Sequence, residues 1–376
     1  MPEIDDQLAD EPIFNAEELD QNNLLREKLV SFIKSEEAIL MAGAGCSGSI
    51  YPPWFAFVKL LKEEALKVDP DFNEDEKNFL AFADKVKQCI GDDRYYAFIS
   101  RTFSPKEKTH EQFHEILCKM PFRAFTTTNY DLVLESALIR IKFHPDYALV
   151  FEGTAKSEIN NFLLSLNDRN AHPKKVAHLH GKYNIEKSIV LSESEYSKKY
   201  GFSIFQNEST LFEKIQTGNI SKEEFDVLIR QYGYEWPIGR KLIWSLMATR
   251  RLVFIGFSFS DPYFLRMLEY LNEDLATYDS ETHFMVVRIT KKNMIQSKNF
   301  AQQLKQTYGI ITVFYEEEDE KYSALADFIL NLGQEVMDIE DAQPVVKKAE
   351  MAGAVTEGSQ EVTDELMELA KKQDLG

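Results

Sequence analysis

Residues 37–48 read Glu-Ala-Ile-Leu-Met-Ala-Gly-Ala-Gly-Cys-Ser-Gly, a short apolar run that ends in a glycine-rich turn. The run predicts a buried strand over Glu37–Ala42, and residues 54–68 return to helical spacing. Glycines in such a turn let the backbone approach a pyrophosphate, and the amides at the start of the next helix favour an anion. Taken alone, the G-x-G-x-x-G spacing fits either a nucleotide site or an ordinary tight turn.

Apolar runs and helical patterns alternate along the rest of the chain. Further strands are predicted at 122–127, 175–179, 188–191, 252–255, 283–289 and 310–315, and helices at 21–34, 132–142, 263–273, 296–307 and 321–333, with helical spacing over 75–118 that breaks near Gly91. This alternation predicts an α/β fold with a Rossmann-like parallel sheet. A dehydrogenase-type dinucleotide site is disfavoured, because that site needs a second strand soon after the glycine turn.

The composition and charge argue against several functions. The 376 residues include 62 acidic and 43 basic side chains, a formal charge of −19. Broad binding to nucleic acid or anionic membrane is therefore not expected, since basic surfaces drive it. No apolar run approaches the roughly 18 residues of a membrane helix, and the acidic start is unlike a signal peptide, so we expect a soluble cytoplasmic protein. The three cysteines, Cys46, Cys89 and Cys118, are too scattered for a zinc module or a disulfide framework.

The domain organisation follows from these patterns. We expect an acidic N-terminal arm over 1–22, one globular domain over 23–335 and an acidic C-terminal tail over 336–376. Residues 192–240 are polar and aromatic and are predicted to form a helical insertion in the domain.

A second polar motif, Thr-Thr-Thr-Asn-Tyr-Asp at 126–131, closes the strand predicted at 122–127. Ligands of open α/β sheets bind at the carboxyl ends of strands. Asn129 can orient a water or a ribose hydroxyl there. The alternative is a strand-ending turn in which Asp131 caps the next helix, and both interpretations can hold together.

Histidines form the third motif, His178-Leu179-His180-Gly181, at the end of another predicted strand. A histidine titrates near neutrality and can act as a general base. The alternatives are a structural histidine or a metal ligand, but no third ligand stands at a useful spacing.

The fourth motif, Gly-Phe-Ser-Phe-Ser-Asp-Pro at 256–262, is a second glycine turn after a strand. It could contact a ribose or phosphates, or Ser260 or Asp261 could simply cap the helix that follows.

In this order the four motifs resemble those of the sirtuin family. The motifs are G-A-G-x-S at 43–47, T-T-N-Y-D at 127–131, L-H-G at 179–181 and G-x-S-x-x-D-P at 256–262. They look closest to the bacterial SIR2-like branch of antiphage defence systems, in particular the systems that pair a SIR2 protein with a HerA ATPase. The resemblance covers about 23–335.

The resemblance implies NAD⁺ as the substrate and no metal cofactor. Catalytic residues are then expected at Asn129 and Asp131, beside the nicotinamide ribose, and at His180, the base. Residues that bind the dinucleotide are expected at Gly43, Ala44, Gly45, Cys46, Ser47, Thr128, Gly256, Ser258 and Asp261.

Two departures from protein-deacylating sirtuins bear on the activity. Those enzymes carry G-I-P-D-F-R after the first glycine turn, where residues 50–55 here read Ile-Tyr-Pro-Pro-Trp-Phe, and they carry a four-cysteine zinc module that three cysteines cannot form. The resemblance therefore implies hydrolysis of NAD⁺ to nicotinamide and ADP-ribose, which depletes NAD⁺ in abortive infection. The alternatives are an NAD⁺-dependent deacylase or ADP-ribosyltransferase, and a non-catalytic module that binds NAD⁺ or ADP-ribose.

A partner is also expected. An unregulated NAD⁺ hydrolase would poison its own cell, so the activity should be gated. A homo-oligomer and a separately encoded HerA-like ATPase are the expected partners, by analogy with the family.

Overall fold

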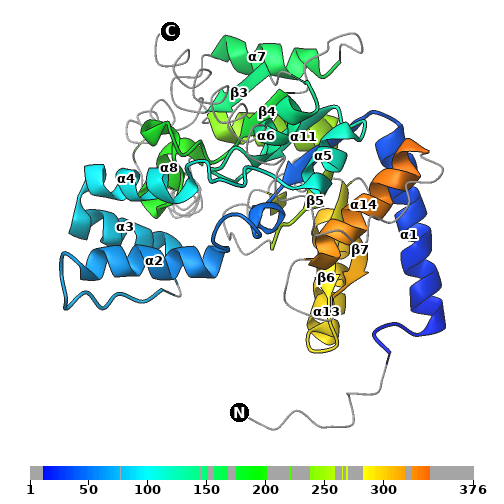
Figure 1. Cartoon of the computed structure of the whole chain (residues 1–376), viewed down its shortest axis with the longest axis horizontal. Helices are drawn as coiled ribbons and strands as arrows, with labels where there is room; N and C mark the ends of the chain where they lie inside the picture. The colour runs from blue at the N-terminus through cyan, green and yellow to red at the C-terminus, as the bar shows by residue number, and fades with distance from the viewer. Residues whose placement is uncertain are drawn as a thin grey trace.

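A parallel sheet organises the chain (Figure 1). The computed structural model describes residues 12–76, 78–143, 146–150, 156–167, 175–200, 221, 238–258, 265, 268–269, 283–317 and 323–338. These residues form seven parallel strands in the order β3-β4-β2-β1-β5-β6-β7. The predicted Rossmann-like α/β fold is confirmed.

The strands have the following bounds: β1 Ala38–Ala42, β2 Ala124–Thr127, β3 Asp146–Val150, β4 Lys175–His178, β5 Arg251–Ile255, β6 His283–Ile289 and β7 Ile310–Glu316. The helices are α1 Ala16–Lys34, α2 Trp54–Leu66, α3 Phe79–Ile90, α4 Asp92–Phe103, α5 Gln112–Lys119, α6 Val133–Arg140, α7 Lys156–Ser165, α8 Glu193–Tyr200, α11 Ile238–Thr249, α13 Met294–Tyr308 and α14 Ser323–Met337, with short 3₁₀ turns η2 Ala44–Ser47 and η3 Glu186–Ser188.

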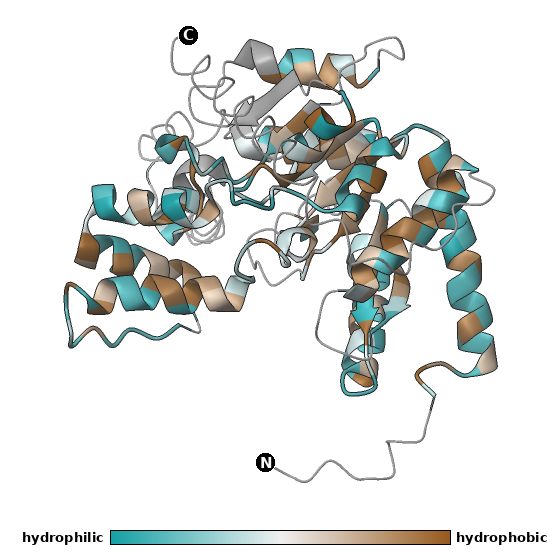
Figure 2. Ribbon diagram, in the orientation of Figure 1, coloured by the Kyte–Doolittle hydropathy of each residue, from teal (hydrophilic) through white to brown (hydrophobic). Residues whose placement is uncertain are grey.

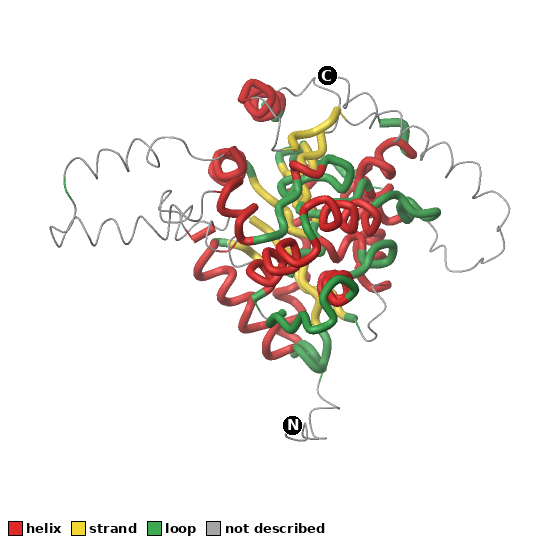
Figure 3. Tube along the Cα trace, turned by 90° about the vertical axis from the view of Figure 1, so that its left-hand side faces the viewer, coloured by secondary structure: helices red, strands yellow, loops and turns green. Residues whose placement is uncertain are grey.

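Helices cover both faces of the sheet, as Figure 3 shows. Side chains alternate along each strand, so Leu40 and Phe125 pack with α1, α5 and α14 on one face. Met41 and Phe254 pack with α7, α11 and α13 on the other. Because both faces are buried, the central strands read as continuous apolar runs.

A third hydrophobic core lies beyond the sheet, within α2, α3 and α4. Phe57, Phe82 and Tyr95 are almost fully buried there, and Tyr130, which follows β2, joins the same cluster. Figure 2 shows hydrophobic and hydrophilic residues alternating along α2, as an amphipathic helix requires. The three helices therefore form a unit that packs against the carboxyl end of β2.

Several element boundaries differ from the sequence prediction. Helix α1 begins at Ala16, inside the predicted N-terminal arm, because Asn15 and Glu18 form a reciprocal capping box. Helix α14 continues to Met337, two residues into the predicted tail. Strand β3 and helix α7 were not predicted.

The strand predicted at 188–191 is wrong. Residues 186–188 form a 3₁₀ turn, and Val190 gives one backbone hydrogen bond to the carbonyl of His180 without extending the sheet. These residues are buried because they fold back over the strand ends, which produces the same apolar pattern as a strand.

Parts of two predictions lie outside the described residues. Within the predicted insertion at 192–240, the structure describes α8, Ser221 and the start of α11. The helix predicted at 263–273 is described only at 265 and 268–269, where it is helical.

Two glycine turns pack directly against each other. The N–H of Gly45 donates to the carbonyl of Gly256 over 2.9 Å. A Cβ built on Gly43 would lie 2.5 Å from that carbonyl oxygen, and one built on Gly256 would lie 2.5 Å from the amide nitrogen of Cys46. Gly256 also has φ +70°, a conformation that side chains rarely adopt. The turn after β1 and the turn after β5 therefore need glycine to meet.

Replacing Gly256 with alanine should destabilise the protein more than replacing Gly91. Gly91 has φ +80° and ψ 156°, but nothing lies within 4 Å of the position that an alanine methyl group would take, so Gly91→Ala should cost only the conformational strain, roughly 1–3 kcal/mol. Gly256→Ala adds the backbone clash and should cost more. Urea unfolding of both variants measures the difference, and equal losses would contradict the role of the contact.

Candidate active site

Four strands end side by side, and their turns carry the four motifs. In the sheet register Ala42 of β1 pairs with Thr127 of β2 and with Ile255 of β5, and Thr127 pairs with His178 of β4. The chain leaves β1 toward β2 on one side and returns to β5 on the other. This is the topological switch point, where open α/β sheets bind ligands.

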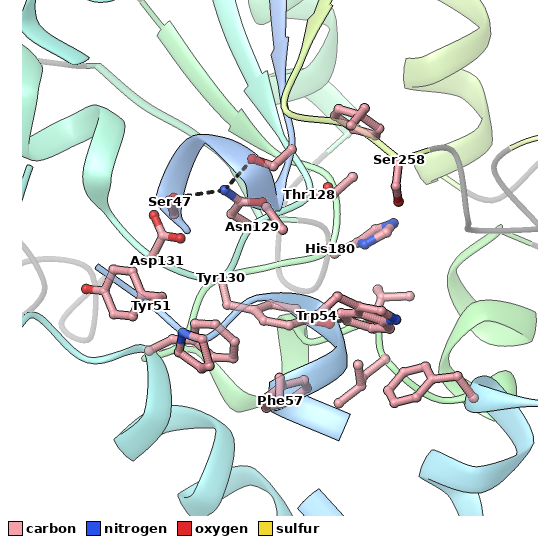
Figure 4. A pocket seen from close by; sticks show the side chains of 18 of the residues that line it. Ser47, Tyr51, Trp54, Phe57, Thr128, Asn129, Tyr130, Asp131, His180 and Ser258 are labelled. Carbon is pink, nitrogen blue, oxygen red and sulfur yellow. Dashed lines mark hydrogen bonds between the residues drawn. The ribbon is translucent and has the colours of Figure 1, made fainter. Parts of the chain in front are cut away.

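A cavity of about 310 Å³ lies at this point (Figure 4). Its lining joins the turns after β1, β2, β4 and β5 to the helices α2, α3 and α8. The lining residues are Gly43, Ala44, Ser47, Tyr51, Pro52, Trp54, Phe57, Asn78, Phe79, Leu80, Phe103, Thr128, Asn129, Tyr130, Asp131, His180, Val190, Leu191, Tyr196, Gly256, Phe257 and Ser258.

The structure brings most of the predicted site residues into this cavity. Those that line it are Gly43, Ala44, Ser47, Thr128, Asn129, Asp131, His180, Gly256 and Ser258. Gly45 and Cys46 are not among the lining residues. Gly45 packs behind the cavity against Gly256, and the buried thiol of Cys46 donates to the carbonyl of Ile255. Asp261 lies outside the described residues.

Asn129 is fixed by the ends of two strands. Its amide nitrogen donates to the carbonyl of Gly43 and to the hydroxyl of Ser47, each over 3.1 Å. Its backbone N–H donates to the hydroxyl of Thr127, which itself donates to the carbonyl of Ala42. The amide donors are thus used to hold the side chain, and the amide oxygen is the group that can accept a hydrogen bond from a ligand.

Asp131 is a buried carboxylate on the same network. It accepts the N–H of Val133 at the start of α6, two residues later, so it supports this helix although Leu132 is the N-cap residue. Burial raises the pKa of Asp131 to about 6, even though the Val133 N–H and the Ser47 hydroxyl stabilise the charged form. A carboxyl group that titrates near pH 6 is typical of functional sites.

His180 lies across the cavity from Asp131, and Figure 4 shows its ring beside Thr128 and Ser258. The residue is 8% exposed, and its Nε2 lies 3.2 Å from the hydroxyl of Tyr196. Gly181 follows it with φ +86°, and a Cβ there would lie 2.2 Å from the carbonyl oxygen of Ser188. The glycine therefore permits the tight turn that presents His180 to the cavity.

The other histidine of the motif is structural. His178 is fully buried, with Nε2 2.6 Å from a carboxylate oxygen of Glu135 and Nδ1 3.1 Å from the carbonyl oxygen of Asn129. Each ring nitrogen thus faces a hydrogen-bond acceptor. Burial alone would raise the pKa of Glu135, but His178 and Lys182 hold it below its ordinary value. Through its contact with the carbonyl oxygen of Asn129, this buried pair fixes the backbone at Asn129.

Aromatic side chains form a wall that the motifs did not predict. Tyr51, Trp54, Phe57, Phe103 and Tyr130 line the cavity, mostly from the unit of α2, α3 and α4. Tyr51 and Trp54 come from the stretch at 50–55 that departs from the deacylase pattern, and Tyr130 comes from the second motif. An apolar wall excludes water and accepts flat rings.

No metal site or membrane span is found in the part of the chain that the structure describes. There, no three His, Cys, Asp or Glu side chains come together in a way that could hold a metal ion. Each of the three cysteines donates to a different backbone carbonyl: Cys46 to Ile255, Cys89 to Ala65 and Cys118 to Leu134. None of the described helices has the length and apolar character needed to cross a membrane.

The sheet and its cavity define a Rossmann-like α/β protein with a cavity at the switch point, the place where open α/β sheets bind ligands. A SIR2-like domain matches residues 123–313, about half of the chain. The chain belongs to the SIR2-like domain family.

Two relatives carry the name NAD(+) hydrolase ThsA. The protein from Cytobacillus dafuensis is 26% identical over 275 residues, which is 73% of this chain and 45% of the relative. The protein from Enterococcus faecium is 22% identical over 291 residues, 76% of this chain and 51% of the relative. The chain spans about half the length of these relatives.

The stability of an Asp131→Asn variant should depend on pH differently from that of the parent. A carboxyl whose pKa rises from 3.8 to about 6 on folding stabilises the protein below pH 3.8, and this contribution is lost as the pH rises through 6. The loss is roughly 3 kcal/mol. Urea unfolding between pH 4 and 7 should therefore show the variant gaining stability relative to the parent until about pH 6. A constant difference over this range would contradict the raised pKa of Asp131.

Glu135 and His178 should be coupled energetically. Glu135→Gln leaves the buried ring without its charged partner and should cost roughly 3–5 kcal/mol of unfolding free energy. His178→Gln should cost a similar amount, because it leaves the carboxylate unpaired. The double variant should be more stable than the sum of the two losses predicts, and strict additivity in this cycle would contradict the pairing.

Proposed function

We propose that the chain is an NAD⁺ glycohydrolase that cleaves NAD⁺ and water to nicotinamide, ADP-ribose and a proton. The observation that carries the proposal is the convergence of Asn129, Asp131 and His180 on one cavity at the switch point of a SIR2-like sheet. The hydrolase name of the two ThsA relatives supports the reaction. The separate positions of the three cysteines favour hydrolysis over deacylation by a zinc-containing sirtuin.

The proposed mechanism uses the groups already placed. The bond between ribose C1′ and the positively charged nicotinamide ring is polarised, so the bond can break without an acid. Asn129 directs its amide oxygen to the water or to a ribose hydroxyl, and His180 accepts the proton that the water loses. Asp131 lies beside the nicotinamide ribose. The dinucleotide phosphates lie near Gly43, Ala44 and Ser47, where backbone amides offset the acidic charge of the chain.

The role that we propose is NAD⁺ depletion in antiphage defence, with the activity controlled by assembly. This rests on the resemblance to the SIR2-like branch of defence systems. We propose a homo-oligomer that acts with a separately encoded HerA-like ATPase. Co-expression and co-purification with such an ATPase test this arrangement, and a monomer that is fully active without any partner contradicts it.

Nicotinamide release from NAD⁺ should be lost in Asn129→Ala and His180→Ala. Loss of a general base slows a reaction by about 10²–10⁴-fold, so His180→Ala should fall in that range. His110 pairs with Glu115 and does not line the cavity, so His110→Ala is a matched control that should keep the parent rate. Thermal unfolding with and without NAD⁺ shows whether each variant folds and binds.

Other outcomes would redirect the assignment. If the His180→Ala variant released nicotinamide at the parent rate, His180 would not be the general base. NAD⁺ binding without any turnover would favour a binding module or an enzyme that awaits its partner. Product formed only with an added acylated or acceptor protein would favour a deacylase or transferase.

A further inference from the structure

Tyr196 lies outside the four motifs and contacts the candidate base. Its hydroxyl lies 3.2 Å from Nε2 of His180, and the two rings are edge to face with centroids 5.2 Å apart. Tyr196 is 5% exposed and lines the cavity. It comes from α8, at the start of the insertion for which the sequence offered no role.

Helix α8 is anchored next to this tyrosine. One carboxylate oxygen of Glu195 accepts the N–H groups of Leu191 and Ser192, at 2.9 and 3.0 Å. The other accepts the hydroxyl of Tyr96 at 2.7 Å and the ammonium of Lys87 at 3.1 Å. Glu195 is buried, so these bonds tie the first turn of α8 to α3 and α4.

Because Tyr196 follows Glu195 directly, the anchor fixes the position from which its side chain extends. A second link, from Ser194 to the carboxylate of Asp84 on α3, holds the same turn. Tyr196 thus meets His180 from a fixed backbone, which is what a residue that orients another side chain requires.

We propose that Tyr196 is a positioning residue for His180, and this rests on the proposed hydrolase function. Its hydroxyl oxygen accepts the Nε2–H of His180, which places the lone pair of the neutral ring on Nδ1. Nδ1 then takes the proton from the attacking water, and the bond from Nε2–H to Tyr196 persists in the charged ring. No side chain has to move during the proton transfer, and the developing charge keeps its acceptor.

Tyr196→Phe removes only the hydroxyl and tests the proposal by steady-state kinetics. We expect kcat to fall by about 10- to 100-fold, the range for a hydrogen bond to a charged group, with KM for NAD⁺ little changed. Tyr308→Phe is the matched control, because Tyr308 is also buried and its hydroxyl also makes a 3.2 Å bond, to Glu269, away from the cavity. This control should keep the parent kcat. A rise in KM without a fall in kcat would mean that Tyr196 only lines the binding cavity, and would overturn the positioning role.

A measurement without substrate separates this proposal from the hydrolase assignment. In protein labelled with ¹⁵N-histidine, the ring nitrogen shifts at mildly alkaline pH report which nitrogen of His180 carries the proton, with His180→Gln assigning the signals among the seven histidines. We expect Nε2 to be protonated in the parent and the two tautomers to mix in Tyr196→Phe. A parent ring protonated on Nδ1, or an unchanged tautomer in the variant, overturns the proposal. Absence of NAD⁺ cleavage by the parent would count against the hydrolase assignment alone, and the tautomer of His180 would still show whether Tyr196 accepts its Nε2–H.

Discussion

The turns after β1 and β5 lie so close that neither has room for a Cβ where they touch. This contact fixes how the two halves of the sheet meet at the switch point, because β1 is the strand on which both halves are hydrogen-bonded. The position of Asn129 depends on it as well, since its amide nitrogen donates to Gly43 in one of these turns. The polar centre of the cavity therefore derives its geometry from backbone packing.

Buried charged and polar groups also hold Asn129 in place. The Glu135–His178 pair lies in the interior, at a point where isolated charges are costly, and it holds the carbonyl of Asn129. Burial raises the pKa of Asp131, although the Val133 N–H and the Ser47 hydroxyl stabilise its charged form. Two carboxyl groups four residues apart thus have opposite pKa shifts, because one faces an imidazole and the other faces neutral donors.

The sequence predicted the architecture because buried parallel strands are short apolar runs, and β6 was predicted with its observed bounds. Asn129, Asp131 and His180 could be predicted to converge, since all follow strands of one parallel sheet. Gly43 and Gly45 both pack against Gly256 and only Gly43 also lines the cavity, a difference that the G-x-G spacing does not carry. The start of α1 was detectable, because Asn15 and Glu18 have capping-box spacing. The contact of Tyr196 with His180 was not, because it depends on how α8 packs against α3 and α4.

Most of the aromatic wall belongs to the third hydrophobic core, whereas Asn129 is held by groups at the ends of the strands. The shape of the wall and the position of Asn129 therefore depend on different parts of the fold. Side chains such as Phe57 and Phe103 are held within the unit of α2, α3 and α4, whereas the polar centre is held by the sheet. Changes in α2 can alter the shape of this wall and leave Asn129 in place, because Gly43 and Ser47, which follow β1, hold its side chain. Related chains can therefore differ in the part of the wall that α2 supplies while they keep the same polar centre, so that sequence change in the one does not require change in the other.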